Sequence, residues 1–246
     1  MIRRRPLILS TVALLAALAG CASAPSAPPA VPRVAVMSAF QPELVLLRQK
    51  LQDAHTTRIN GVEFHTGTLE GRPVLLFLSG ISMTNATMNT QLALDRFPVS
   101  HIVFSGIAGG VNPQLSIGDV TVPAQWGQYL ELLMAREVAP GRYEPPPFIK
   151  DATLPNFGFM FPRPVEFRSA AQPQVTRRFW FEADPGMLAA ARNLKVDLAA
   201  CAAGTCLKHP PRLVVGGNGV SGQAFMDNKA FREYTFDTFH ANVLDM

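Results

Sequence analysis

The chain has 246 residues, 48% of them hydrophobic, and a formal net charge of +4. This is enough apolar material for a sizeable core, and the length fits one domain. Without Arg3, Arg4 and Arg5, 19 basic residues face 18 acidic ones, which leaves a net charge of about +1. A balance this close to neutral gives no electrostatic case for a nucleic-acid partner.

The first 20 residues have the organisation of an export signal. Three arginines precede a short apolar run from Leu7 to Leu18, and small residues then lead to Cys21. This order is typical of a secretory signal peptide, and the run is short for a membrane-spanning helix. Leu-Ala-Gly-Cys at 18–21 resembles a bacterial lipobox. We therefore expect residues 1–20 to be a lipoprotein signal peptide and Cys21 to be lipidated. The alternative is an ordinary signal that is cut near a cysteine.

Residues 21–32 are rich in Pro, Ala and Ser, which is typical of an extended tether. No aspartate follows Cys21, and by resemblance to Gram-negative lipoproteins this favours the outer membrane over the inner one. We expect an outer-membrane lipoprotein that faces the periplasm and contacts the membrane through its lipid anchor only. Residues 33–246 would form the domain.

A short apolar strand at Val34–Met37 is followed by a helix that starts at Gln41. Pro42 lies in the first turn of this helix, where its missing N–H costs nothing. Glu43 lies in the same turn, near the carboxyl end of the strand. The helix dipole alone favours a glutamate there, so the residue type leaves both a structural and a catalytic role open.

Two turn signals, Asn60-Gly61 and Glu70-Gly71, divide residues 56–79 into a predicted antiparallel meander. Helical spacing follows from Thr84 to Phe97. We expect the methionines of this helix, such as Met88, to belong to the core rather than to contact a ligand.

Three glycine-rich strand ends are the main functional signal. Ile102–Phe104 is expected to be a buried strand that ends in the turn Gly106–Gly110, and similar turns are expected at 79–86 and 216–222. Glycines at the carboxyl end of a strand let a ligand approach main-chain N–H groups, whereas the alternative is a tight turn with no ligand. Because ligands of α/β sheets bind at the carboxyl ends of strands, we expect the three turns to meet.

Residues 126–178 hold many prolines and aromatic residues and give no clear pattern. We expect a large covering loop, which would be either a lid over the 5′ end of a substrate or a packed surface excursion or dimer contact. An Ala-rich helix over 188–198 then leads to Cys201 and Cys206. In an oxidising compartment this near pair favours a disulfide over free thiols, and zinc would need more ligands.

The last part of the chain repeats the order of strand and helix. Leu213–Val215 is a predicted strand, Lys229–Phe239 is a predicted helix with Asp227 as its cap, and Val243–Met246 is a predicted buried strand. Strands that alternate with helices around one meander predict an α/β fold with three layers, α/β/α, and a central, mixed, twisted sheet.

Four segments in this order resemble the purine nucleoside phosphorylase and nucleosidase superfamily: Ser79–Ala86, Gly106–Gly110, Gly118–Val122 and Val214–Met226. The resemblance covers roughly residues 33–246 and is strongest to methylthioadenosine/adenosylhomocysteine nucleosidases. Trp180–Met246 also resembles plant bark-storage proteins. The resemblance implies a purine nucleoside as the ligand, no cofactor, no metal and, from the relatives, a homodimer.

The resemblance also implies roles for individual residues. Nucleosidases of this family have an acidic residue at the position of Glu43 that positions and activates the attacking water. Ala108 and Gly109 would form the floor under the reacting sugar. Phe225 would stack on the purine, although it could instead pack under the next helix. The main chain of Met226 would bond the Watson–Crick edge, and Met246 would pack on the sugar.

The chain departs from the family pattern at Ile107, where relatives often have a small or hydroxyl residue. No arginine stands near this strand end in the sequence, so a phosphate dianion lacks charge-assisted donors and water is favoured as the nucleophile. The usual glutamate after Met246, a later Ser-Asp pair that protonates N7 of the purine, and the last strand and helix have no counterpart. We therefore expect this sequence to be a shortened form of a longer protein. The alternative is a natural variant that has lost catalysis.

Three functions follow from these observations. The first is a purine nucleosidase that hydrolyses the N-glycosidic bond of nucleosides like methylthioadenosine or adenosylhomocysteine. The second is a phosphate-dependent nucleoside phosphorylase, which a strict phosphate requirement would identify. The third is a non-catalytic nucleoside-binding or storage-like lipoprotein, which would bind a nucleoside but release no base.

Overall fold

A computed structural model describes residues 31–246 except residue 203. The predicted signal peptide, Cys21 and most of the predicted tether lie outside the described residues. Among the helices of the described part, none is both long enough and apolar enough to cross a membrane.

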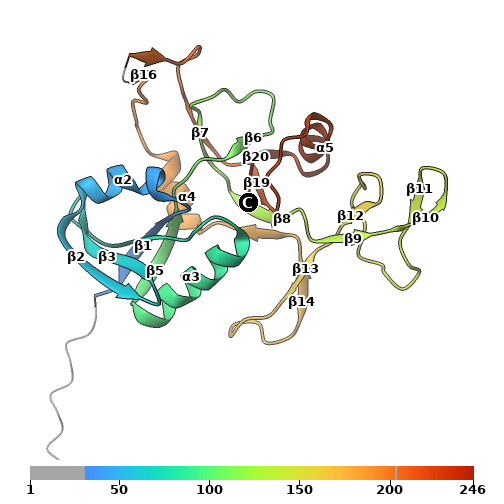
Figure 1. Ribbon diagram of the computed structural model, residues 1–246, viewed down its shortest axis with the longest axis horizontal. Helices are drawn as coiled ribbons and strands as arrows, with labels where there is room; N and C mark the ends of the chain where they lie inside the picture. Colours follow the sequence, from blue (N-terminus) through green and yellow to red (C-terminus); the bar gives the residue numbers. More distant parts are fainter. Residues whose placement is uncertain (1–30, 203) are drawn as a thin grey trace, which may run out of the picture.

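Residues 33–104 build the first of two five-stranded sheets (Figure 1). From one edge to the other its strands are β2 (Gln52–Ile59), β3 (Val62–Leu69), β4 (Arg72–Leu78), β1 (Arg33–Ser38) and β5 (Val99–Phe104). β3 runs antiparallel to β2 and β4, whereas β1 runs parallel to β4 and β5. The turns of the meander lie at Asn60-Gly61 and Glu70-Gly71, where all four residues have positive φ angles. The predicted meander is confirmed.

Helices cover both faces of this sheet. They are α2 (Gln41–Lys50) and α3 (Met83–Arg96). Successive residues of a strand point to opposite faces, and β4 therefore supplies two apolar clusters. Leu76 packs with Leu44 of α2, whereas Phe77 packs with Ala93 of α3, and all four side chains are at most 1% exposed. The helix–sheet–helix order agrees with the predicted three layers.

Two expectations about burial in this sheet are wrong. The strand that became β5 was expected to be buried, but Ile102 and Phe104 are each 40% exposed. Among the described strands β5 pairs with β1 alone, so its other edge has no neighbour. Met88 was expected in the core, yet it is 63% exposed because it lies on a face of α3 that points away from the sheet.

The second sheet is also mixed. Its strands are β15 (Trp180–Glu182), β8 (Gln125–Gln128), β19 (Asn218–Ser221), β20 (Ala241–Asp245) and β6 (Gly109–Gly110). β19 runs parallel to β8 and β20, and the two outer pairs are antiparallel. A short parallel pair precedes β8 and β19 along the chain, β7 (Val120–Val122) and β18 (Leu213–Val215). The chain passes from the first sheet to the second through residues 105–108.

Helix α5 (Lys229–Phe239) contributes Phe231 and Phe239 to the core of the second sheet, where they surround the fully buried Tyr129. The predicted cap of α5 is wrong by one residue, because the side chain of Asn228 accepts the Phe231 N–H at 2.9 Å. The predicted turn over 216–222 is also too long. Only Gly216 and Gly217 have positive φ angles, and residues 218–221 continue as β19.

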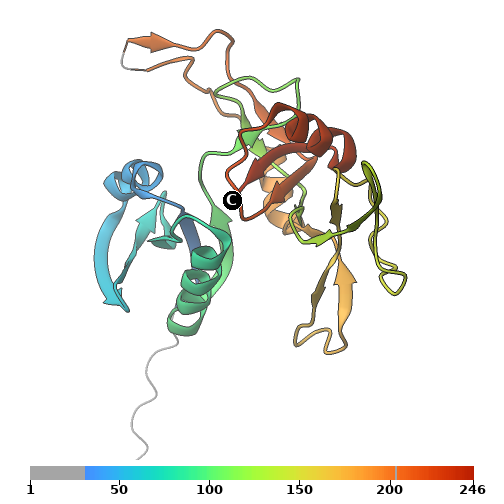
Figure 2. The same cartoon turned by 45° about the vertical axis from the view of Figure 1, so that its right-hand side comes forward.

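Residues 132–178 form small hairpins that lie on the side of the second sheet away from the first (Figure 2). The strands are β9 (Leu132–Met134), β10 (Arg136–Ala139), β11 (Arg142–Glu144), β12 (Met160–Pro162), β13 (Val165–Phe167) and β14 (Thr176–Arg178). β10 pairs with β11, β9 with β12, and β13 with β14, all antiparallel. The covering loop expected from the sequence therefore has regular structure of its own.

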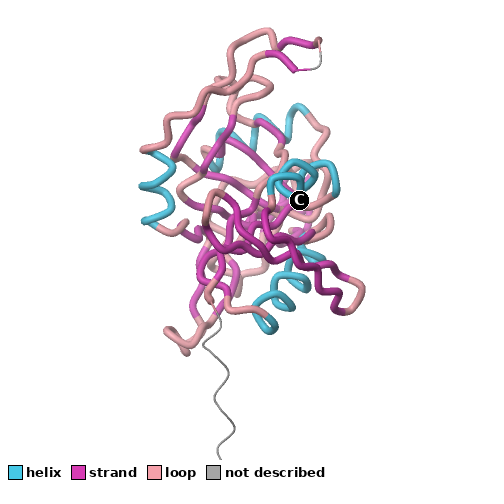
Figure 3. Tube along the Cα trace, turned by 90° about the vertical axis from the view of Figure 1, so that its left-hand side faces the viewer, coloured by secondary structure: helices cyan, strands magenta, loops and turns pink. Residues whose placement is uncertain are grey.

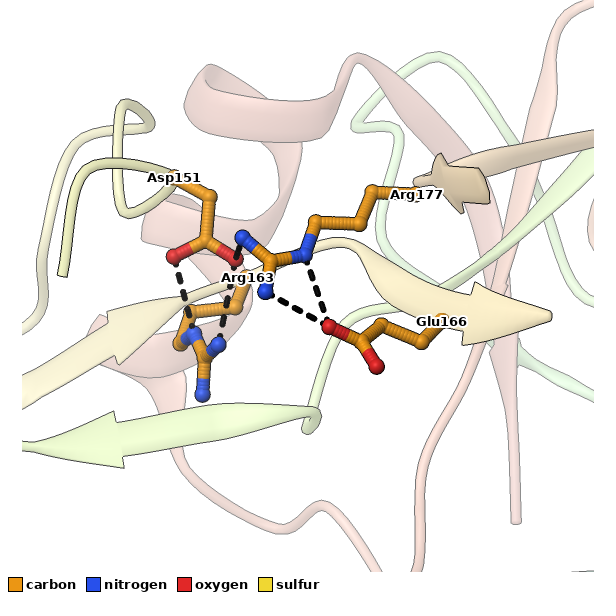
Figure 4. A network of polar contacts seen from close by, with 4 residues as sticks. All are labelled: Asp151, Arg163, Glu166 and Arg177. Carbon is orange, nitrogen blue, oxygen red and sulfur yellow. Dashed lines mark hydrogen bonds and ion pairs between the residues drawn. The ribbon is translucent and has the colours of Figure 1, made fainter. Parts of the chain in front are cut away.

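An ion-pair network joins these hairpins (Figure 4). The Arg163 guanidinium donates two hydrogen bonds to the Asp151 carboxylate, from Nε at 3.2 Å and from Nη2 at 3.1 Å. Arg177 lies 3.3 Å from the same carboxylate and also binds Glu166 at 2.6 Å. The Asp151 side chain is only 12% exposed, so a largely buried carboxylate connects the loop before β12 to the β12–β13 connection and to β14.

The segment between the two halves of the second sheet holds α4 (Pro185–Arg192) and a small hairpin of β16 (Cys201–Ala202) and β17 (Thr205–Cys206). α4 starts earlier than predicted because Asp184 caps it, accepting the Met187 N–H at 2.8 Å, and it ends at Arg192 rather than Leu198. A disulfide joins Cys201 to Cys206. Figures 1 and 3 show this hairpin extending outward from the rest of the chain.

Candidate functional site

The carboxyl ends of β1, β4 and β5 meet at one edge of the first sheet. The hydroxyl of Ser38 donates to the Ser105 carbonyl oxygen at 2.7 Å, and the Ser79 N–H donates to the Ser38 carbonyl oxygen at 2.8 Å. Ser38 and Ser79 are both fully buried. These bonds fix three strand ends next to each other, which is where a parallel α/β sheet binds its ligands.

Glu43 is held at this edge by main-chain donors. Its Oε2 accepts the N–H of Ala39 at 2.7 Å and that of Phe40 at 3.4 Å, and its Oε1 accepts the N–H of Ile107 at 2.8 Å. The bonds to residues 39 and 40 close a box at the start of α2. The bond to Ile107 spans to the glycine turn after β5, so one carboxylate joins the start of α2 to that turn.

Gly106 makes this arrangement possible. A Cβ at this position would lie 2.8 Å from Glu43 Oε1 and 3.1 Å from Oε2. Any larger residue would push the carboxylate away from the Ile107 N–H. The glycine is therefore needed for a close approach rather than for an unusual backbone angle.

The end of β20 brings a second carboxylate toward Glu43. The pKa of Asp245 is raised because its carboxyl group is buried, and the negative charge of Glu43 raises it further. Met246, the residue expected to pack on the sugar, follows Asp245 directly. Sequence reasoning missed Asp245, although an acidic residue at the end of a buried strand was a usable signal. The charges of Glu43 and Asp245 therefore influence each other across the end of β20.

A cavity of about 400 Å³ lies between the glycine turn after β5 and the start of α5. Gly109 and Met226, two of the predicted substrate-binding residues, line it, and Leu244 of β20 contributes beside them. The remaining lining residues are Gly110, Val111, Asp227, Asn228, Lys229 and Arg232. No arginine lies near this strand end in the sequence. Arg232 reaches the cavity because the fold packs α5 beside the strand end.

Phe225 and Ala108 do not line this cavity. The Phe225 side chain is 84% exposed, which rejects simple packing under α5, the alternative considered for it. Ala108 and its neighbour Ile107 are also exposed at the glycine turn. Gln223, two residues before Phe225, donates from Nε2 to the Thr84 hydroxyl at 3.3 Å. This contact places the loop after β19 beside the start of α3. The turn at Gly216-Gly217 lies at the other end of β19, beside Asn242 at the start of β20, so the prediction that all three glycine turns meet is wrong for this turn.

The two sheets and the convergent strand ends define an α/β domain that is built to bind a small ligand at the carboxyl edge of its strands. The profile described as "Phosphorylase superfamily" matches residues 33–246. The chain belongs to this superfamily, as the sequence motifs predicted.

Three known proteins illustrate the relationship. Over 90 residues, 37% of this chain and 39% of that protein, the chain is 42% identical to the 5′-methylthioadenosine/S-adenosylhomocysteine nucleosidase of Bacillus subtilis. It is 28% identical over 221 residues to the nucleosidase of the same name from Bacillus thuringiensis, covering 83% of this chain and 96% of that one. A solved nucleosidase from Colwellia psychrerythraea, in complex with adenine, superposes with a TM-score of 0.60 at 24% identity, covering 87% of this chain and 72% of that one. These similarities confirm the predicted fold class.

Proposed function

We propose that the protein is a purine nucleosidase that hydrolyses the N-glycosidic bond of methylthioadenosine-like or adenosylhomocysteine-like nucleosides. The observation that carries the proposal is the Glu43 carboxylate, fixed by three main-chain N–H groups at the edge where the strand ends meet. The relatives named methylthioadenosine/adenosylhomocysteine nucleosidases supply the substrate class.

The reaction that this geometry supports is a displacement by water. Glu43 accepts a hydrogen bond from the water and takes its proton as the oxygen bonds to the anomeric carbon. The bond from that carbon to N9 breaks as its electron pair passes to the purine. N7 of the purine takes a proton from solvent water, and the base leaves neutral. Because three N–H donors fix the carboxylate, little reorganisation is needed when the water attacks.

The base would occupy the cavity that Gly109 and Met226 line, with the Met226 main chain at its Watson–Crick edge. Phe225 is exposed and would close over the purine as a stacking partner. Ala108 would lie under the sugar, and Met246 would pack against it from the end of β20. In this pose the sugar lies between the base cavity and Glu43.

Water is favoured over phosphate because the Glu43 carboxylate occupies the glycine turn. Its Oε1 already uses the Ile107 N–H, a donor that a phosphate would need. A carboxylate at this place would also repel a dianion. The Arg232 side chain is on the far wall of the base cavity, so phosphate dependence is still worth measuring.

The test is a base-release assay with the protein as its gene encodes it, including any residues that follow Met246. Methylthioadenosine is incubated in phosphate-free buffer, and adenine is separated and quantified by chromatography. We expect adenine without phosphate and no acceleration when phosphate is added. Release only with phosphate would establish the phosphorylase instead, and binding without release would establish a nucleoside-binding protein.

We also propose that the domain is anchored in the outer membrane through a lipid on Cys21 and faces the periplasm. The basic start, the apolar run and the Leu-Ala-Gly-Cys sequence support this. Labelled palmitate should enter the wild-type protein, and Cys21→Ser should abolish both labelling and co-sedimentation with outer membranes. Unchanged labelling of Cys21→Ser would reject the anchor.

A homodimer is proposed from the family resemblance. Its mass can be measured directly by light scattering of the purified domain. A single species with the monomer mass at micromolar concentration would reject it.

A further inference from the structure

A second cavity, of about 390 Å³, lies on the other side of α2 from the Glu43 carboxylate. Glu43 points toward the turn after β5, whereas this cavity lies over the ends of β3 and β4, and β1 separates β4 from β5 in the sheet. We call it the α2 cavity. Its lining residues are Gln41, Leu44, Arg48, Arg58, Gly61, Val62, Glu63, His65, Leu78, Gly80 and Asn89.

Hydrogen-bond donors dominate the polar lining of the α2 cavity. Gln41 and Arg48 lie on the same face of α2, seven residues apart, and Asn89 reaches it from α3. Arg58 comes from β2. Glu63 is the one carboxylate among the lining residues, and it already forms an ion pair with Arg58.

Arg48 is the cation that is not neutralised. No carboxylate in the described part of the chain lies within ion-pair distance of its guanidinium. Burial lowers the pKa of His65, and the positive charge of Arg48 lowers it further. An arginine that lines a cavity and presents several donors is suited to a planar or tetrahedral oxyanion.

His65 adds a buried polar group that faces the same space. The residue is 4% exposed, and its Nδ1 bonds the Thr56 hydroxyl at 2.8 Å. Its Nε2 lies 3.9 Å from the nearest Glu63 oxygen, which is too long for a hydrogen bond. One ring nitrogen is therefore satisfied within the sheet, and the other has no hydrogen-bond partner among the described residues. This second nitrogen is not one of the fully buried side-chain atoms that lack a partner, so it has access to the cavity that His65 lines.

We propose that the α2 cavity binds a small oxyanion of the size of phosphate, held by Arg48, His65 and the amide of Gln41. The anion supplies the acceptor that Nε2 of His65 lacks and the negative charge that Arg48 lacks. Its source is either free inorganic phosphate or the phosphate group of a nucleotide. Since the cavity lies on the far side of α2, an anion bound there does not reach the glycosidic bond.

Calorimetric titration with inorganic phosphate tests this site, with adenosine 5′-monophosphate as a second arm. Arg48→Gln removes the free cation and should weaken phosphate binding roughly tenfold or more. Gln41→Glu places a repelling carboxylate in the cavity and should weaken binding similarly. Because an acidic residue is favoured at a helix start, this variant should still fold. Arg72→Gln, at the exposed first residue of β4, is the matched control and should bind phosphate as the wild type does.

Circular dichroism and melting curves establish that each variant is folded. Glu43→Gln should leave phosphate affinity unchanged, which separates this site from the proposed nucleosidase site. Tighter binding of the nucleotide than of phosphate would identify a nucleotide phosphate as the occupant, and the reverse order would identify free phosphate. The proposal is overturned if phosphate does not bind at low millimolar concentration, or if folded Arg48→Gln and Gln41→Glu variants bind it like the wild type.

Discussion

Two regions of this molecule are stabilised in different ways. Residues 33–104 form a sheet with an apolar cluster on each face, where Phe64, Leu75, Leu76 and Phe77 are completely buried. Residues 132–178 form three small two-stranded ribbons, and the carboxylate of Asp151 joins two of them, β9–β12 and β13–β14, through Arg163 and Arg177 (Figure 4). The first region holds Glu43, and the second holds none of the proposed catalytic or substrate-binding residues.

The difference shows where rigidity is placed in the fold. A sheet that is packed on both faces can hold a carboxylate in a fixed position, and catalysis requires a precision of about 0.5 Å. Ribbons of three or four residues per strand cannot bury much apolar surface by themselves, and an ion-pair network therefore closes them. We expect changes in the first region to affect turnover and changes in the second to affect stability.

The largest effect is expected for Glu43→Gln. The amide keeps the shape of the side chain but cannot take a proton from water, so turnover should fall about 10²–10⁴-fold while nucleoside binding changes little. Base release and ligand binding are measured on the same preparation. Glu144→Gln, an exposed glutamate of β11 in the second region, is the matched control and should keep full activity. Unchanged turnover in Glu43→Gln would remove this residue from the mechanism.

Gly106→Ala tests how closely Glu43 must be held. The new methyl group would lie 2.8 Å from Glu43 Oε1, so the carboxylate must move and lose the Ile107 N–H. We expect kcat to fall roughly 10- to 100-fold with a native circular dichroism spectrum. A kcat equal to that of the wild type would show that the bond to Ile107 is not needed.

Asp151→Asn tests the second region. Two arginines would lose their shared carboxylate, and the free energy of unfolding should fall by about 1–2 kcal/mol, which lowers the melting temperature by roughly 2–8 °C. The matched control is Glu166→Gln, because Glu166 is 54% exposed and its loss should cost less than about 0.5 kcal/mol. If the ribbons act as a lid, KM should also rise in Asp151→Asn. An unchanged KM would make them a packed surface excursion.

The smallest effect is a dependence of stability on pH. The hydrogen bonds from Arg163 lower the pKa of Asp151. A hydrogen bond from the Ser116 N–H lowers the pKa of Asp119, and hydrogen bonds from Arg212 lower it further. A lowered pKa in the folded state gives stability that is complete above the unfolded value of about 4. That stability is lost as pH falls through the folded values. The melting temperature should therefore be constant from neutral pH to about 5 and fall below about 4, with a shallower fall in Asp151→Asn.

Much of the first region could be predicted from sequence because its signals are local. Asn60-Gly61 and Glu70-Gly71 fix the hairpins, and the position of Glu43 in the first helical turn follows from Pro42 beside it. The exposure of β5 could not be predicted from an apolar run such as Ile102–Phe104, because burial depends on which strands pair alongside.

The second region and parts of the site depend on contacts between distant residues. Asp151 meets Arg177 across 26 positions of sequence, and nothing in either residue's neighbourhood indicates the pair. The same is true of Arg232, which reaches the cavity lined by Gly109 only after α5 has packed. Glycine turns could be located from the sequence, but the turn at Gly216-Gly217 was predicted too long because a glycine can also continue a strand, as Gly219 does.

The most direct test of the proposed chemistry is to follow the oxygen atom. Methylthioadenosine is cleaved in H2(18)O, with phosphate present, and the sugar product is analysed by mass spectrometry. Hydrolysis assisted by Glu43 predicts a free sugar with one 18O at the anomeric carbon. A sugar 1-phosphate without the label would contradict the account, since phosphate rather than water would then be the nucleophile.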